Sequence, residues 1–189
     1  WMPDKPEGRK RWLTRNEAAR LLWAVRHDEH LKLFILICIY GGGRKVATLE
    51  LRWPQIKFEE GIVDFKKPGE KKTNKGKPTN HVPAKLMWWL RKAYERRESD
   101  LGYVITYRGK QIKNNRKAFA KAVKRAGLET SGPDKVTPHT CKHTCGTWMA
   151  RNGAPMVLVA KYLAHSIERT TELYIHLAPD DTKKAAGYL

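Results

Sequence analysis

The longest apolar run in this chain extends from Leu33 to Tyr40 and is followed at once by Gly41, Gly42 and Gly43. A run of this size predicts one buried helix, because spanning a bilayer takes about 18–20 apolar residues. Glycine interrupts helices strongly, so the helix is expected to end at the triplet. This part of the chain is therefore expected inside the core.

Helices dominate the rest of the prediction. Thr14 and Glu17 have the spacing of a capping box, which favours a helix from there to about residue 26. Further helices are expected at residues 30–40, 44–51, 84–97, 113–126, 139–151, 155–163 and 179–187.

A small sheet is expected in the middle of the chain. Residues 53–58, 61–65 and 79–83 predict three antiparallel strands, and the basic connection 66–78, marked by Gly and Pro, predicts a mobile loop. The predicted fold class is mixed α/β, mainly helical, with a small three-stranded antiparallel sheet.

The composition indicates a polyanionic partner. The chain has 189 residues, 41% of them hydrophobic, which suits one domain with a real core. Lys and Arg number 38 against 19 Asp and Glu, a formal net charge of +19. Nucleic acid is the usual partner of such a charge. The N-terminus has no signal-peptide pattern, and the chain lacks the low-complexity tails of basic ribosomal or chromatin proteins.

The cysteines favour a reducing, cytoplasmic setting. Cys38, Cys141 and Cys145 are odd in number and poorly spaced for a disulfide framework. The alternating run from His139 to Cys145 invites a zinc site. On a helix, however, His139 and His143 share one face while the two cysteines share another, so four ligands cannot converge on one ion. We expect no metal, and interpret the thiols as small apolar groups facing the core.

Four segments form one combined pattern: G-G-R-K-V-A-T-L-E-L-R-W (42–53), H-T-C-K-H-T (139–144), L-A-H (163–165) and T-T-E-L-Y-I-H (170–176). Together they resemble the catalytic region of the tyrosine recombinases, or phage integrases. That family has glycines before an arginine that opens a helix, then H-x-L-R-H-T, L-G-H and T-x-x-Y-x-H.

The resemblance implies a site and a reaction. The implied catalytic residues are Arg44, Lys75, His139, Lys142, His165 and Tyr174, with Tyr174 as nucleophile. The hairpin lysine is Lys75 by its offset from Pro83, although Lys72 matches the K-T pairing of the family. Residues expected to contact DNA are Lys71, Lys72, Lys77, Arg116 and Lys117. The expected function is site-specific DNA recombination through a 3′-phosphotyrosyl intermediate, without metal, ATP or other cofactor.

The chemistry accounts for these residue types. Guanidinium groups match the non-bridging phosphate oxygens and stabilise the charge that develops on them. A tyrosine hydroxyl, with a pKa near ~10, needs a proton acceptor, and His139 is the expected one. His165 would donate a hydrogen bond to a phosphate oxygen, and the lysine would protonate the leaving 5′ oxygen.

Three positions depart from the family pattern. Lys142 stands where the second arginine is expected, Ala47 where an acid is common, and Ala164 where glycine precedes the second histidine. Lysine keeps the charge but loses the planar five-donor fork. An integrase-derived DNA-binding protein with impaired catalysis is therefore one alternative, and a type IB topoisomerase is another.

The domain prediction is a single catalytic domain over residues 1–189, with 1–10 as a linker and 177–189 as a tail. The resemblance also implies an additional N-terminal DNA-binding domain, absent from this sequence, and a homotetramer on DNA for the full-length protein.

Overall fold

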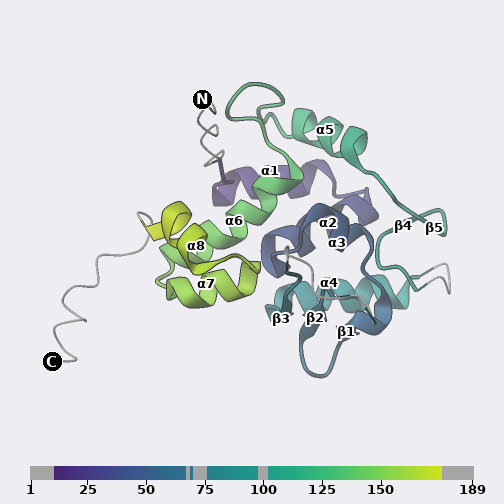
Figure 1. Cartoon of the computed structure of the whole chain (residues 1–189). Helices are drawn as coiled ribbons and strands as arrows, with labels where there is room; N and C mark the ends of the chain where they lie inside the picture. The colour runs from purple at the N-terminus through teal and green to yellow at the C-terminus, as the bar shows by residue number, and fades with distance from the viewer. Residues whose placement is uncertain (1–10, 67–68, 70–75, 98–101, 176–189) are drawn as a thin grey trace, which may run out of the picture.

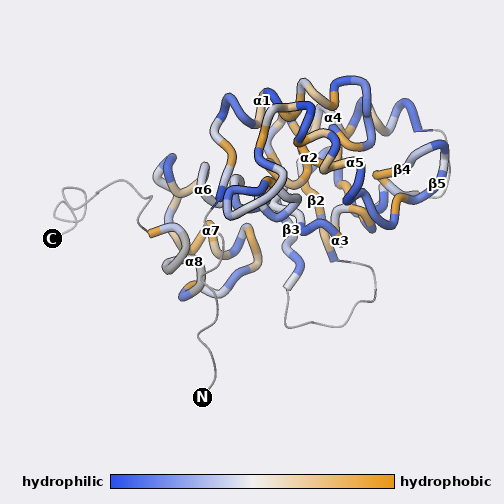
Figure 2. Tube along the Cα trace, turned by 90° about the horizontal axis from the view of Figure 1, so that it is seen from above, coloured by the Kyte–Doolittle hydropathy of each residue, from blue (hydrophilic) through white to orange (hydrophobic). Residues whose placement is uncertain are grey.

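Helix α2 (Glu29–Gly41) lies at the centre of the molecule, as the apolar run predicts. The computed structural model describes residues 11–66, 69, 76–97 and 102–175. Every residue of α2 from Leu33 to Ile39 is buried, and Figure 2 shows this apolar stretch inside the more hydrophilic outer turns. Helices α3, α4 and α6 pack against it. No helix of the described residues is both long and apolar enough to cross a membrane.

The other helices, except α8, follow the sequence prediction closely. They are α1 (Arg15–Ala24), α3 (Lys45–Leu49), α4 (Ala84–Glu95), α5 (Arg116–Arg125), α6 (Pro138–Arg151), α7 (Met156–Leu163) and α8 (Ile167–Tyr174). The capping box of Thr14 and Glu17 is present at the start of α1. Helix α8 was not predicted, and the predicted helix at 179–187 lies outside the described residues. Figure 1 shows α6, α7 and α8 grouped on one side of the molecule, and these three helices contact one another.

The three-stranded sheet is confirmed, with shorter strands than predicted. Strands β1 (Ile56–Lys57), β2 (Ile62–Asp64) and β3 (Thr79–His81) are antiparallel in the order β1-β2-β3. Residues 53–55 form a 3-10 turn, so the strand expected at 53–58 was wrong in its first half. Pro54 explains the difference, because proline lacks the N–H that a ladder needs.

A second hairpin was not predicted. It pairs β4 (Thr106–Tyr107) with β5 (Lys110–Gln111). Strands of two residues are too short to show an alternating pattern, which explains the omission.

The glycine triplet shapes the turn that leads to Arg44. Gly42 has a φ of 70°, in the left-handed region that favours glycine. A Cβ on Gly43 would lie 2.4 Å from Thr48 Oγ1 and 2.7 Å from the Phe65 ring. The chain can therefore turn sharply and start α3 at Lys45 only with these glycines.

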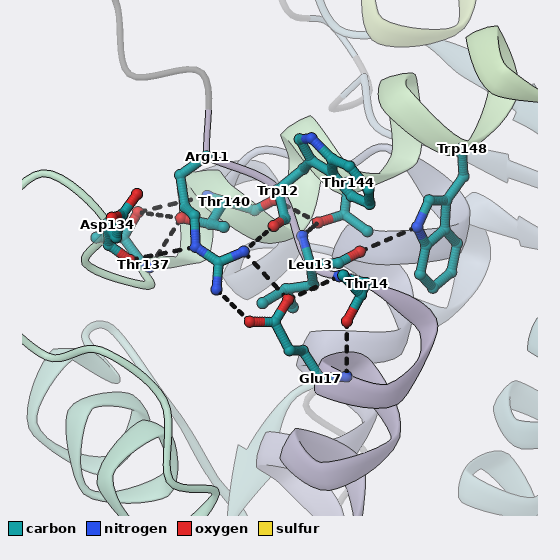
Figure 3. Close-up of polar contacts among 10 residues, drawn as sticks. All are labelled: Arg11, Trp12, Leu13, Thr14, Glu17, Asp134, Thr137, Thr140, Thr144 and Trp148. Atoms are coloured by element: carbon teal, nitrogen blue, oxygen red, sulfur yellow. Dashed lines mark hydrogen bonds and ion pairs between the residues drawn. The ribbon is translucent and has the colours of Figure 1, made fainter. Parts of the chain in front are cut away.

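Residues 11–14, which precede α1, are hydrogen-bonded to side chains of α6 (Figure 3). Thr144 Oγ1 accepts from the backbone N–H of Leu13 at 2.8 Å and donates to the carbonyl of Thr140 at 2.8 Å. One turn later, Trp148 Nε1 donates to the Leu13 carbonyl at 3.0 Å. Both backbone groups of Leu13 are thus bonded to side chains of α6, in a region closed to water.

We expect Thr144→Val to lower the free energy of unfolding by about 1–3 kcal/mol, because the Leu13 N–H would stay buried without its acceptor. Thr144→Ser keeps the hydroxyl and should lose less. Urea denaturation of both variants measures the difference. A Thr144→Val variant as stable as the parent, with a loss in Thr144→Ser only, would show that the methyl group, and not the hydrogen bond, carries the contribution.

Helix α7 ends with a left-handed residue that is not glycine. Ala164 has φ 48° and ψ 54°, and its N–H and that of His165 bond back to the last turn of the helix. The backbone therefore keeps the conformation that glycine favours at such a helix end, despite the methyl group. An alanine there costs about 1 kcal/mol relative to a relaxed backbone.

We expect Ala164→Gly to raise the free energy of unfolding by up to about 1 kcal/mol, because the strain of the left-handed alanine disappears. Ala160→Gly, within the same helix, is the matched control and should lower it by about 1 kcal/mol. Thermal and urea denaturation measure both. A loss of stability in Ala164→Gly would contradict the strain argument.

Candidate active site

Helix α6 supplies two groups of the expected site, His139 and Lys142, and a neighbouring histidine, His143. Thr137 and Thr140 cap its first turn, as the side chain of each bonds to the backbone of the other. His139 is exposed, whereas His143 is buried and Lys142 is only 1% exposed. The rings of His139 and His143 lie one turn apart in a T-shaped contact, with centroids 4.4 Å apart. The expectation that the two histidines share a helix face is confirmed.

Tyr174 lies at the end of α8 and faces α6. Its side chain is 2% exposed, and its hydroxyl lies 3.0 Å from Nδ1 of His143. Gly146 makes room for the ring: a Cβ there would be 2.7 Å from Tyr174 Cζ and 2.8 Å from its hydroxyl oxygen. The phenol is therefore seated directly on the helix that carries the histidines.

Two cationic side chains meet at the C-terminal end of α7. Lys142 Nζ donates to the Leu163 carbonyl at 2.7 Å, and Arg44 Nη2 donates to the Ala164 carbonyl at 3.0 Å. The last carbonyls of a helix carry partial negative charge and lack helical partners, so cations bind them well. His165 follows directly in the chain, half-buried. Arg44, Lys142 and His165, distant in sequence, thus lie around one turn.

The hairpin between β2 and β3 approaches the same place. Arg44 Nη1 donates to the carbonyl of Gly76. Lys77 is half-buried. Three of the lysines named from the sequence, Lys71, Lys72 and Lys75, lie outside the described residues, so the choice between Lys75 and Lys72 stays a prediction.

Basic residues border a hollow beside the site. A depression of about 400 Å³ lies between α5 and the start of α6, and its lining includes Lys45, Arg116 and Lys135. Arg116 and Lys117 are exposed in the first turn of α5. Lys45 follows Arg44 in the chain and bonds to Asn114 Oδ1 at 2.9 Å. Positive side chains thus continue from Arg44 toward α5.

The thiols lie in or against the core. Cys38, Cys141 and Cys145 are buried, and burial raises the pKa of Cys38 and of Cys145 to about 12. Neutral thiols of this kind are poor metal ligands. In the described part of the chain, no group of three or more His, Cys, Asp or Glu side chains is placed to hold a metal ion.

Two contributors to the site were missed or undervalued from the sequence. His143 is not among the catalytic residues implied by the sequence, but it contacts the Tyr174 hydroxyl. Gly146 was not singled out, although it lies on α6 under the phenol. A glycine in the middle of a predicted helix is the signal that pointed to a close approach.

The arrangement can perform nucleophilic chemistry on an anionic centre. Tyrosine supplies an oxygen nucleophile, an imidazole in hydrogen-bond reach can take its proton, and adjacent cations can bind the oxygens of an anion. The groups come from α6, α8 and the turn before α3, so only the folded chain brings them together.

We expect Gly146→Ala to lower the free energy of unfolding by about 1–3 kcal/mol, because the methyl group would overlap the Tyr174 ring. Replacing glycine by alanine within a helix usually raises the free energy of unfolding, so a decrease in this variant indicates steric overlap with the ring. Gly41→Ala is the control, since its Cβ meets its neighbours at 3.4 Å or more. Urea denaturation measures both variants, and a Gly146→Ala variant as stable as the parent would contradict this seat for the phenol.

The chain is similar to known recombinases in sequence. A model of the phage integrase family matches residues 11–181. The tyrosine recombinase XerA of Thermococcus onnurineus (strain NA1) is 26% identical over 186 residues, covering 97% of this chain and 64% of the relative. The chain therefore spans just under two thirds of the length of that relative.

The fold is similar to solved structures as well. The catalytic domain of bacteriophage HP1 integrase superposes with a TM-score of 0.69 at 23% identity, covering 94% of each chain. The Tn1549 transposon integrase in complex with transposon right end DNA gives a TM-score of 0.75 at 20% identity, covering 98% of this chain and 67% of that one. These likenesses concern the fold. With the family model matching nearly the whole chain, this protein belongs to the phage integrase family, the family of the tyrosine recombinases.

Proposed function

We propose that this chain is the catalytic domain of a site-specific recombinase that cuts and rejoins DNA strands through Tyr174. The observation that carries the proposal is the contact of the Tyr174 hydroxyl with His143 Nδ1 at 3.0 Å, on the helix that also holds His139 and Lys142. Arg44 and Lys142 donate to the carbonyls at the end of α7, and His165 follows that end directly in the chain. A nucleophile, an imidazole and cations in one place suit phosphoryl transfer from DNA.

In the proposed reaction the cations exchange carbonyl oxygens for phosphate oxygens. Arg44 and Lys142 donate to the neutral carbonyls of Ala164 and Leu163. A phosphate oxygen carries more negative charge than a carbonyl, so its hydrogen bonds with these groups are shorter and stronger. His165 adds a further donor, and a lysine of the hairpin, Lys75 or Lys72, protonates the leaving 5′ oxygen.

Double-stranded DNA is the proposed partner. The net charge of +19 and the basic side chains that border the site supply contacts to phosphates. Lys77, Arg116 and Lys117 are the described candidates for such contacts. The similar Tn1549 integrase is described in complex with DNA, which supports the same class of partner here. We further propose a tetramer on DNA as the active assembly.

The burial of Lys142 favours a second candidate function. Its side chain is 1% exposed, its ammonium lies 2.7 Å from the Leu163 carbonyl, and lysine lacks the bidentate fork of arginine. A chain that binds DNA and cleaves it slowly, or not at all, would have this feature. The loss of one charge-assisted contact in such a site costs about 10²–10³ in rate.

Covalent capture separates the two functions. The protein is incubated with a pool of nicked duplexes of randomised sequence, and covalent complexes are detected on a denaturing gel. We expect a complex with the parent chain, none with Tyr174→Phe, and an unchanged amount with Tyr94→Phe, a surface tyrosine that serves as the control.

Lys142→Arg decides how far the lysine limits the reaction. An increase of about 10²–10³ in the rate of covalent capture is expected if the missing fork is the defect. DNA binding without a complex in the parent and in Lys142→Arg would contradict the recombinase and support the DNA-binding alternative. Relaxation of a supercoiled plasmid without strand exchange would instead indicate a topoisomerase.

A further inference from the structure

A second hollow lies at the other end of α2 from Arg44. It is enclosed by the first turn of α2, the last turn of α4 and the β4–β5 hairpin, and has a volume of about 350 Å³. The hairpin is on the side of the molecule away from α7 and α8 (Figure 1). Arg44 follows the C-terminal end of α2, and a helix of 13 residues is about 20 Å long. The hollow is therefore separate from the candidate active site.

Basic side chains predominate around this hollow. Five of them line it, namely His27, His30, Arg96, Arg97 and Arg108. Among the described residues of the lining, Glu29 is the one acid, and it pairs with Arg96 at 3.0 Å. Both partners of this pair are well exposed, so the pair contributes little in water and Arg96 can bind another anion. Three arginines against one carboxylate give the hollow a net positive charge.

Two of these arginines lie over aromatic rings. The Cζ atom of Arg97 is 4.2 Å from the centroid of the Tyr94 ring, and that of Arg108 is 5.4 Å from the centroid of the Tyr107 ring. Arg97 also donates one N–H to the Tyr94 carbonyl at 3.0 Å. A guanidinium has five N–H donors in a planar fork, and a ring below it does not consume them. Both groups can therefore donate to an anion in the hollow.

Arg108 occupies a backbone position that suits arginine poorly. With Gly109 it forms the two-residue turn between the paired residues Tyr107 and Lys110. The φ angles are 49° at Arg108 and 71° at Gly109, both in the left-handed region. Turns of this kind favour Asn, Asp or Gly, because other side chains are strained there. An arginine kept in a strained conformation beside a basic hollow points to a role for its side chain.

The hairpin is held next to the start of α2. The ring of His30 meets the Tyr107 ring edge-on, with centroids 5.1 Å apart. Within the described residues, Asp28 pairs with Arg125 and makes no side-chain hydrogen bond to the first turn of α2. The N-terminal end of a helix carries partial positive charge and favours anions. The helix end and the arginines therefore attract the same kind of ligand.

We propose that this hollow binds a phosphate group, away from the reaction centre. Guanidinium groups match phosphate oxygens in charge and geometry, often through two parallel hydrogen bonds. The volume lies in the range of small-ligand sites, so a phosphate and part of the ester attached to it can enter. Two sources carry this group, namely the backbone of a DNA segment outside the cleavage site and a free phosphate ester.

Two substitutions in the hairpin form a matched pair. Arg108→Asn removes a charge from the hollow and suits the turn better, because Asn adopts positive φ more readily. We expect its melting temperature to equal or exceed that of the parent. Lys110→Asn removes the same charge from an exposed residue of the same hairpin, outside the lining of the hollow.

Inorganic phosphate is the probe, and the readout is the NMR shift of the His30 and Gly109 amides at constant ionic strength. We expect a saturable shift in the parent and in Lys110→Asn, and a Kd weaker by about tenfold or more in Arg108→Asn. A shift in the parent that grows linearly without saturation would overturn the proposal. Equal affinity in the parent and Arg108→Asn would overturn it as well.

A DNA duplex separates the two sources of phosphate. Fluorescence anisotropy gives the Kd at several salt concentrations, and the slope of log Kd against log salt reports the number of phosphate contacts. We expect the slope to fall by about 1 in Arg108→Asn and to stay at the parent value in Lys110→Asn. An unchanged slope in Arg108→Asn, beside its weaker binding of inorganic phosphate, would support the site with a free phosphate ester as its ligand.

This inference and the proposed function fail in different experiments. A parent chain that forms no covalent complex through Tyr174 would contradict the proposed function and leave the phosphate titration unaffected. A parent chain that forms the complex but shows no saturable shift at His30 and Gly109 would contradict the phosphate site alone.

Discussion

The C-terminal end of α7 is the point on which the arrangement of the site depends. Lys142 and Arg44 donate to the carbonyls of Leu163 and Ala164, which follow one another in the chain. One cation comes from α6 and the other from the turn before α3, so these two hydrogen bonds join distant parts of the sequence. The attraction is strong there because the last carbonyls of a helix concentrate negative charge. His165 follows Ala164 directly in the chain, so the same turn fixes the position of its backbone.

Other contacts hold α7 in position behind this junction. The Tyr162 hydroxyl donates to the Tyr40 carbonyl at 2.7 Å, and Asn80 Nδ2 donates to the carbonyls of Gly41 and Tyr162. The end of α2, the sheet and α7 are therefore bonded to one another next to Arg44. These hydrogen bonds and those of Leu13 to α6 hold α6 and α7 in position. Tyr174 packs against α6 with its hydroxyl in contact with His143.

Much of the fold could be predicted because its signals are local. The apolar run at Leu33–Tyr40, the Gly triplet and the Thr14 cap mark elements through backbone and solvent effects that act within a few residues. Helix α8 escaped prediction because residues 167–174 are few and mix charged, polar and apolar side chains. Its shape follows from packing on α6 and α7, which no local pattern records.

The sequence by itself determined which residues could take part: Arg44, His139, Lys142, His165 and Tyr174 stand at the spacing of the family pattern. It did not determine that His143 contacts the tyrosine, because that contact joins residues 31 positions apart in the chain. Only the tertiary structure decided it: α8 packs on α6, and the space at Gly146 admits the phenol beside His143.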